Sequence, residues 1–471
     1  MLLDPALDPW LVPVPVEPSG YVPVDAAHGV YNVQTALGRI ASFAWDLDAL
    51  GASEVLHADL QLHPEENLAG RLGSGRAGRY RAMVLKGVGR TSLAANWNDA
   101  ADRFHGNGWL SASAALRERL ITEALRRDGA AHLIVPTEGL LLRAIPAAAR
   151  ASLDEAARAS NWHLTPLDRA VVALALRPAD HARISNVLWS AHHHETSPAF
   201  LGSLLLRLAS YLRDPAARAK AEDDTFTGEP DAIAQALAAG IERSVLRGLD
   251  WVRRGVFWLS FHDNFTLDGR FLDLETPVYR GAPWVGFVRS AASGALHLVG
   301  FEAMQIAAQW RLFVRTLIAR LRALADPAVV ASPGARRFLR AVAAAMRAHT
   351  RELWPLDADT LARRVVRELA DILGASRRER AELTTLGAAA AASAFTQASV
   401  PYADHVGAVI EGPQPAQPTV SGRAEFCMAK GLGAPKLTDS ARWFHDAIRS
   451  IEALDDRDRA LDAIRAALAS R

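Results

Sequence analysis

The sequence predicts an α+β protein in which a small strand-rich lobe precedes a large helical lobe. Polar and apolar residues alternate over 79–87, as they do in a half-buried strand. The apolar runs at 131–145 and 169–178 look like strand pairs. Beyond about residue 195, most segments carry leucine or alanine roughly every 3.6 residues, which is the period of a helix.

The elements of the first part follow from local signals. A helix is expected near 30–50, and a glycine-rich segment at 68–91 contains the strand at 79–87. The segment 111–129 predicts a helix, because its leucines follow helical spacing and a glycine stands where the helix should end.

Helices are expected through most of the second part. They are placed at 196–213, 230–254, 300–326, 335–352, 358–373 and 440–470. The alanine-rich stretch 386–395 is also expected to be a packed helix, since alanine favours that structure. Residues 256–279 interrupt the pattern and predict two short strands around a turn. The proline-rich stretch 411–422 is expected to be a linker or an extended wrap.

Composition limits the kind of partner and compartment. The formal net charge of +1 gives no reason to expect nucleic acid or an anionic membrane as the main partner. The single cysteine, Cys427, excludes an intramolecular disulfide and a cysteine-based zinc site. The N-terminus lacks the basic start and apolar run of a signal peptide, and no stretch reaches the roughly 18 apolar residues of a membrane span. We therefore expect a cytoplasmic protein.

Lysine is scarce, so a lysine within a motif is informative. Lys86 ends the strand at 79–87 and follows the glycines Gly73 and Gly75. The backbone N–H groups of a glycine turn can approach phosphates closely, because glycine has no Cβ. A lysine ammonium neutralises phosphate charge, and a helix glutamate can hold it in place. Glu118, on the helix expected at 111–129, is the candidate for that role.

The stretch HDNFTLDGRFLDLET, residues 262–276, places Asp263, Asn264 and Asp273 close together. Aspartate and asparagine oxygens suit a hard cation such as Mg²⁺. A glycine turn, a strand lysine, a helix glutamate, an Asp-Asn pair and a second aspartate follow one another in the order of a two-lobed protein-kinase-like fold. A reverse turn is the alternative explanation for the Asp-Asn pair.

Five motifs carry a resemblance to a known family. They are LGSGRA (72–77), VLKGVGRT (84–91), GNGWLSASAALRE (106–118), LRPADHARI (176–184) and HDNFTLDGRFLD (262–273). They resemble motifs of the selenoprotein O family, kinase-fold enzymes that transfer AMP rather than phosphate to protein hydroxyls. The resemblance covers roughly residues 68–280. GNGW stands where the family has GDGR.

The resemblance implies a set of nucleotide-binding residues drawn from several segments. They are Gly73, Gly75, Arg76, Lys86, Asn107, Gly108, Arg177 and Arg183. Lys86 would contact phosphate and pair with Glu118. The two arginines Arg177 and Arg183 would hold the outer phosphates of an ATP bound in the family's flipped orientation.

Catalytic and metal-binding residues are implied in the same way. Asp263 would take the proton from the acceptor hydroxyl, and Lys86 and Glu118 would complete the catalytic set. Asn264 and Asp273 would bind Mg²⁺ or Mn²⁺. The acceptor would be a hydroxyl of a protein, with a small-molecule hydroxyl left open.

On this interpretation the chain has three parts. Residues 1–195 would form the N-terminal region and the nucleotide-binding lobe, and residues 196–410 the helical lobe with the metal and catalytic motif. Residues 411–471 would form the proline-rich linker and a C-terminal helix.

Two rival functions stay open. The first is a kinase of the same fold acting on a small molecule or peptide. The second is an ATP-binding pseudoenzyme that acts as an interaction module, which the altered GNGW (106–109) favours. The HHHE run at 192–195 invites a transition-metal site or a role in acceptor binding, because histidine is a common metal ligand. The Asp268–Gly269 pair is best explained as the tight turn itself.

Overall fold

The computed structural model describes the chain in segments separated by gaps. The described residues are 11–13, 22–24, 68–70, 77–80, 83–87, 110–145, 147–159, 164–178, 230–258, 266, 269–275, 277–290, 296–328, 333–353, 358–397, 426–433 and 437–470. The helices expected at 30–50 and 196–213 lie outside these residues, as does the proline-rich stretch 411–422. Within them the chain is a mixture of helices and antiparallel sheets, as expected for an α+β protein.

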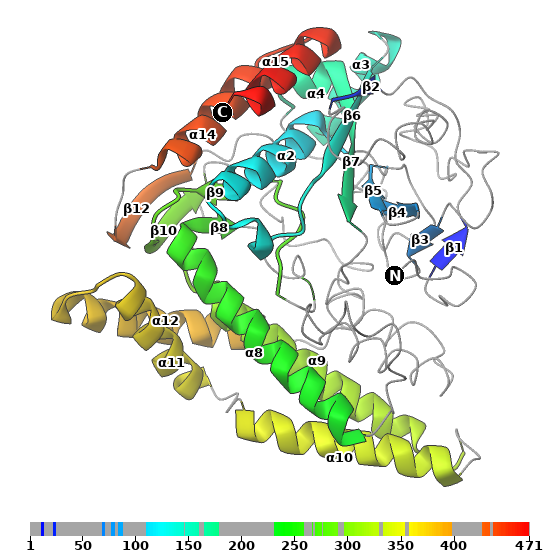
Figure 1. The fold of residues 1–471 in the computed structure, drawn as a ribbon, viewed down its shortest axis with the longest axis vertical. Helices are drawn as coiled ribbons and strands as arrows, with labels where there is room; N and C mark the ends of the chain where they lie inside the picture. Colours follow the sequence, from blue (N-terminus) through cyan, green and yellow to red (C-terminus); the bar gives the residue numbers. More distant parts are fainter. Residues whose placement is uncertain are drawn as a thin grey trace.

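The largest sheet has seven strands in the order β1-β3-β4-β5-β7-β6-β2, and each neighbouring pair is antiparallel. It lies at the end of the molecule away from the longest helices (Figure 1). The strands are β1 (Leu11–Pro13), β2 (Val22–Pro23), β3 (Leu68–Gly70), β4 (Ala77–Tyr80), β5 (Met83–Lys86), β6 (Gly139–Ala144) and β7 (Val171–Pro178).

Three strand predictions were wrong in detail. The segment 79–87, expected as one strand, contains the end of β4 and all of β5, with Tyr80 opposite Met83. The intervening Arg-Ala lacks the glycine or asparagine that marks a tight turn, and the alternation continues through it. The run 131–145 supplies only β6, because its start forms the short 3₁₀ helix η4 (Ala131–Leu133). The run 169–178 supplies the single strand β7.

The helix predicted at 111–129 is confirmed as α2 (Ala112–Arg127). The Ser111 hydroxyl caps its first turn by accepting the Ala114 N–H at 3.2 Å. Gly129, with a φ of 65°, follows the last turn in the left-handed conformation that ends many helices. Helix α2 packs against β6 and β7.

Asp168 joins the start of α2 to the neighbouring helix α4 (Pro166–Ala170), which follows α3 (Ala147–Ala159). Its buried carboxylate accepts the backbone N–H and the hydroxyl of Ser113 at 2.9 and 2.8 Å. It also accepts the N–H and hydroxyl of Thr165 at 3.1 and 2.8 Å, which completes a capping box. One carboxylate thus fixes two helix starts.

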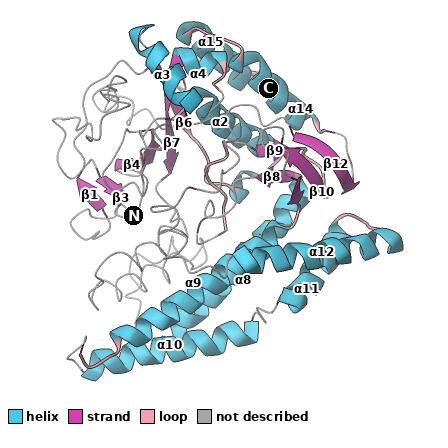
Figure 2. Cartoon of the chain, turned by 180° about the vertical axis from the view of Figure 1, so that it is seen from behind, coloured by secondary structure: helices cyan, strands magenta, loops and turns pink. Residues whose placement is uncertain are grey.

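The long helices of the second part are confirmed. They are α8 (Pro230–Arg254), α9 (Glu302–Leu324), α10 (Pro333–Leu353), α11 (Ala358–Ile372) and α12 (Arg377–Gln397), of which α12 contains the alanine-rich stretch. Helices α8, α9 and α10 pack against one another, and α11 packs against α12 (Figure 2). In the described part of the chain no helix combines the length and the apolar character that crossing a membrane requires.

Residues 256–279 form the two short strands that the sequence predicts. Strands β8 (Val256–Trp258) and β9 (Pro277–Tyr279) pair in antiparallel fashion. A further sheet, of three strands, was not expected. Strand β10 (Trp284–Ser290) pairs on one side with β11 (Leu296–Val299) and on the other with β12 (Phe426–Gly433).

The C-terminal segment forms two helices where one was expected. Helix α14 (Asp439–Glu452) ends four residues before α15 (Arg457–Ala469), which is capped by the Asp456 carboxylate. Helix α14 packs on α2, where Arg117 lies 2.5 Å from Glu452 and Ser440 donates to Asp128 at 2.7 Å. The C-terminal residues therefore support the helix that covers the large sheet (Figure 1).

Replacing Asp168 should destabilise the protein strongly. The change Asp168→Ala leaves the buried polar groups of Ser113 and Thr165 without their acceptor, and we expect a loss of about 3 kcal/mol in the free energy of unfolding. Asp154 is the matched control, because its bond to Arg169 is exposed, so Asp154→Ala should cost less than about 1 kcal/mol. Equal losses in urea unfolding would contradict this account of the two helix starts.

Glu302 should make stability depend on pH. It is 3% exposed, and burial raises its pKa to about 7. Because the folded-state pKa lies above the ordinary value of 4.5, stability is lost as pH rises from about 4.5 through 7. We expect wild type to lose about 2 kcal/mol more than Glu302→Gln between pH 5 and pH 8. The exposed Glu242→Gln is the control, and parallel pH profiles for wild type and Glu302→Gln would refute the prediction.

Candidate functional site

Lys86 lies in the middle of the large sheet, on β5 between β4 and β7. Its partner across β7 is Ala175, and Arg177 stands opposite Val84. Residues directly opposite one another share a face of a sheet, and so do residues two apart along a strand. Lys86 and Arg177 therefore project from the same face as diagonal neighbours.

Glu118 meets both of these cations from α2. Its exposed fraction is 1%. The Lys86 ammonium donates to Oε1 at 2.7 Å, and the Arg177 guanidinium donates to Oε2. The hydroxyl of Thr137 also donates to Oε2, at 3.2 Å. Both oxygens of this buried carboxylate thus have charged or polar donors.

Asp273 and Glu275 reach the same cations from a separate segment. Lys86 Nζ lies 2.8 Å from Asp273 Oδ1 and 2.6 Å from Glu275 Oε1. Arg177 donates to the same Asp273 oxygen at 2.6 Å. Three carboxylates therefore surround two cations, and we call these five residues the Lys86 cluster.

Phe271 holds in place the segment that carries Asp273 and Glu275, which we call the acidic segment. The Phe271 N–H donates to the Leu133 carbonyl at 3.0 Å, and its carbonyl accepts the Val135 N–H at 2.7 Å. Its ring also contacts that of Trp251 on α8. Leu133 and Val135 lie just before β6, so the acidic segment is attached beside the large sheet and against α8.

The tight turn expected at Asp268–Gly269 is seen in its described residues. Gly269 has a φ of 81°, and its N–H donates to the Thr266 carbonyl at 2.9 Å. The Thr266 N–H in turn donates to the Arg270 carbonyl at 2.9 Å. The chain reverses here and enters the segment that carries Asp273.

Asp273 has an unusual backbone conformation. Its φ of 59° lies in the left-handed region, which aspartate tolerates better than most residues. The Glu275 N–H then donates to the Asp273 carbonyl at 2.8 Å, which makes a three-residue turn. This turn directs two carboxylates to one ammonium while Leu272 and Leu274 are buried. Backbone strain of this kind is concentrated at functional sites.

The cluster keeps Glu118 ionised. Burial alone would raise the pKa of Glu118, but the charges of Arg177 and Lys86 outweigh it, so the pKa lies below the ordinary value of 4.5. The cluster thus combines three carboxylates with two cations.

Burial is uneven across the Lys86 cluster. Lys86, Glu118 and Arg177 are buried, whereas the side chains of Asp273 and Glu275 are 17% and 20% exposed. A ligand would therefore approach from the side of the two carboxylates. Phosphate oxygens can replace carboxylate oxygens on a lysine and an arginine, because both are anionic acceptors.

The carboxylates of Asp273 and Glu275 are the kind of ligand that binds a hard divalent cation. Asp273 and Glu275 both present carboxylate oxygens, which Mg²⁺ and Mn²⁺ prefer, and Mg²⁺ usually takes few protein ligands. Within the described residues no group of three or more metal-binding side chains is placed to hold an ion.

The structure brings together four of the predicted site residues, namely Lys86, Glu118, Arg177 and Asp273. The other predicted site residues lie outside the described part of the chain. They are Gly73, Gly75, Arg76, Asn107, Gly108, Arg183, Asp263 and Asn264, and the histidines at 192–194 lie outside it as well. Their roles stay predictions.

Glu275 was missed. It lies two residues beyond Asp273, and the turn between them directs both carboxylates to Lys86. Nothing in the local sequence marks this turn or distinguishes Glu275 from a surface acid.

No protein-family model matches the sequence, and no curated protein is significantly similar to it. A functional assignment therefore depends on the residues of the site themselves.

Removing the charge of Glu118 should destabilise the fold. Glu118→Gln removes a negative charge that neutralises Lys86 and Arg177. We expect the free energy of unfolding, measured in urea at pH 7, to fall by about 3 kcal/mol. The pKa of Glu118 is lowered, so its contribution is present above pH 4.5 and is lost as pH falls below that value. The deficit of the variant should therefore shrink in acid.

Glu123→Gln is the control for this measurement. Glu123 lies on the same helix and is 23% exposed, with its arginine partners at 3.7 Å. Its replacement should cost less than about 1 kcal/mol. A deficit for Glu118→Gln that matches this control, or that stays constant with pH, would show that the cluster does not stabilise the protein.

Proposed function

We propose that this chain is an ATP-dependent nucleotidyltransferase with a two-lobed, protein-kinase-like fold. It would move AMP from ATP to a hydroxyl, with Ser, Thr or Tyr of a protein as the acceptor, and release pyrophosphate. The observation that carries the proposal is the Lys86 cluster, in which a strand lysine pairs with the helix residue Glu118 at 2.7 Å and with Asp273 at 2.8 Å.

The order of the elements supports a kinase-like nucleotide site. Protein kinases carry a lysine on the third strand of the small lobe, and it pairs with a glutamate of the helix that follows. Here β3, β4 and β5 are successive neighbours in the sheet, Lys86 lies on β5, and α2 with Glu118 comes next. Asp273 comes later in the chain, as the metal-binding aspartate does in protein kinases.

Lys86 and Arg177 would bind the phosphates of ATP. Both now neutralise carboxylates, and both have the donors that phosphate oxygens accept. When phosphates take over these donors, Asp273 and Glu275 become available as oxygen ligands. A divalent cation bound there would neutralise charge on the phosphates. Glu118 would stay in place and hold Lys86 toward the nucleotide.

The chemical step follows from the resemblance to the selenoprotein O family. The acceptor hydroxyl oxygen would form a bond to the α-phosphorus while the bond from that phosphorus to the pyrophosphate oxygen breaks. Asp263 would take the hydroxyl proton, as a general base does. Lys86 and Arg177 would stabilise the charge that develops on the phosphates.

A kinase is the second candidate. The pairing of Lys86 with Glu118 is a feature of protein kinases as well, and it serves γ-phosphoryl transfer equally. The two reactions differ in the phosphorus atom that is attacked and in the product that leaves, pyrophosphate or ADP.

Transfer from labelled ATP tests the proposal. The protein is incubated with a bacterial lysate, Mg²⁺ or Mn²⁺, and ATP labelled on either the α- or the γ-phosphate. We expect α-label on protein, reduced at least about 100-fold in Lys86→Met and in Asp263→Ala, because phosphate binding and proton transfer are then lost. Asp250→Ala, a change at an exposed ion pair on α8, should transfer like wild type.

Other labelling patterns reject the proposal in different ways. Label from the γ-phosphate alone would make the protein a kinase. Transfer that persists unchanged in Lys86→Met would remove the cluster from the reaction. ATP binding with no transfer to protein or to small molecules would favour the pseudoenzyme.

A further inference from the structure

The hairpin of α9 and α10 is far more basic than the rest of the chain. Residues 302–353 contain nine arginines and three acidic residues, although the whole protein has a formal net charge of only +1. Arg336, Arg340 and Arg347 recur at intervals of four and seven on α10, which places them along one face of the helix. The excess charge is therefore concentrated on a surface.

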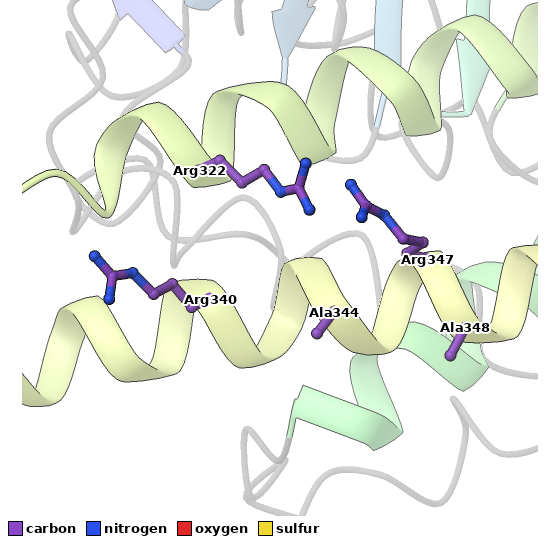
Figure 3. A pocket seen from close by; sticks show the side chains of 5 residues that line it. All are labelled: Arg322, Arg340, Ala344, Arg347 and Ala348. Atoms are coloured by element: carbon purple, nitrogen blue, oxygen red, sulfur yellow. The ribbon is translucent and has the colours of Figure 1, made fainter.

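A pocket lies between these two helices, with a volume of about 490 Å³. Its lining residues are Arg322 of α9 and Arg340, Ala344, Arg347 and Ala348 of α10. Figure 3 shows the guanidinium groups of Arg322 and Arg347 directed toward one another across the gap between the helices. The small side chains of the two alanines leave space beneath the arginines.

Arg340 is held at one end of the pocket, where it donates to the Ala325 carbonyl at the end of α9 at 3.2 Å. Among the residues that the structure describes, neither Arg322 nor Arg340 pairs with a carboxylate. Asp326, just beyond α9, accepts the Ala328 N–H at 2.8 Å, and Asp231 of α8 pairs with His349 at 2.9 Å.

Three arginine side chains line one hollow, so an anion bound between them could accept hydrogen bonds from more than one guanidinium group. The planar guanidinium fork matches the geometry of phosphate and binds it through paired hydrogen bonds. The volume of the pocket is in the usual range for a small molecule, about 300–1,000 Å³.

We infer that this pocket, the Arg322–Arg347 pocket, binds the phosphate groups of a soluble phosphorylated small molecule. It is separate from the Lys86 cluster, because its lining residues belong to α9 and α10 and none belongs to the large sheet or to α2. The inference does not depend on the proposed function.

Binding of inorganic pyrophosphate tests this inference by calorimetry on the whole protein. A chelator keeps divalent metal absent, so that metal-dependent binding at the Lys86 cluster does not contribute. We expect the pyrophosphate affinity of Arg322→Gln/Arg347→Gln to fall at least about 10-fold. Arg377→Gln/Arg378→Gln is the matched control on α12, where Arg378 is 90% exposed, and it should bind like wild type.

Two further binding measurements show which site binds pyrophosphate and whether that site prefers phosphate to carboxylate. Lys86→Met should keep wild-type pyrophosphate affinity, so failure of the proposed function and failure of this inference remain distinguishable. Citrate, a multiply charged carboxylate, should bind more weakly than pyrophosphate. Arg322→Gln alone, together with a thermal unfolding curve for each variant, shows whether an effect comes from lost binding or from lost structure.

Several results would overturn the inference. They are no pyrophosphate binding to wild type, equal affinity in Arg322→Gln/Arg347→Gln, and equal affinity for citrate. Binding only to phosphatidylcholine vesicles that contain phosphatidic acid, without binding of free pyrophosphate, would identify a membrane surface instead and would also overturn it.

Discussion

The burial of Glu118 between two cations is the constraint on which the rest of the structure depends. A carboxylate taken out of water costs several kcal/mol unless it is paired and hydrogen-bonded. Lys86 and Arg177 supply that pairing from adjacent strands, and both also bind Asp273. Helix α2, the large sheet and the acidic segment therefore meet at one buried charge, and none of them can shift without leaving it uncompensated.

Residues far from the cluster keep α2 in the position that this burial requires. Asp168 fixes the start of α2 through Ser113, and Arg117 connects its middle to the C-terminal helix α14. Phe271 attaches the acidic segment beside the start of β6. The cluster is therefore fully buried on the side of Glu118 and partly exposed on the side of Asp273 and Glu275.

The sequence predicts the helices and site residues whose signal lies within one short segment of the chain. The long helix at 230–254 was predicted because its apolar period extends over many residues, and Lys86, Glu118 and Asp273 were found through motifs and their spacing. The reversal between Tyr80 and Met83 was missed because no turn residue marks it. The sheet of β10, β11 and β12 depends on pairing between residues more than a hundred positions apart. The ion pairs of Arg177 with two carboxylates could not be read from the sequence, and its predicted phosphate contact stays a prediction.

The most direct test of the central claim is a calorimetric titration of the protein with a non-hydrolysable ATP analogue and Mg²⁺. The account predicts binding by wild type and an affinity at least about 10-fold lower in Lys86→Met and in Asp273→Asn, because each change removes a charge that holds the phosphates or the metal. Glu123→Gln should bind like wild type. Equal affinity in all four proteins would show that the Lys86 cluster is not the nucleotide site.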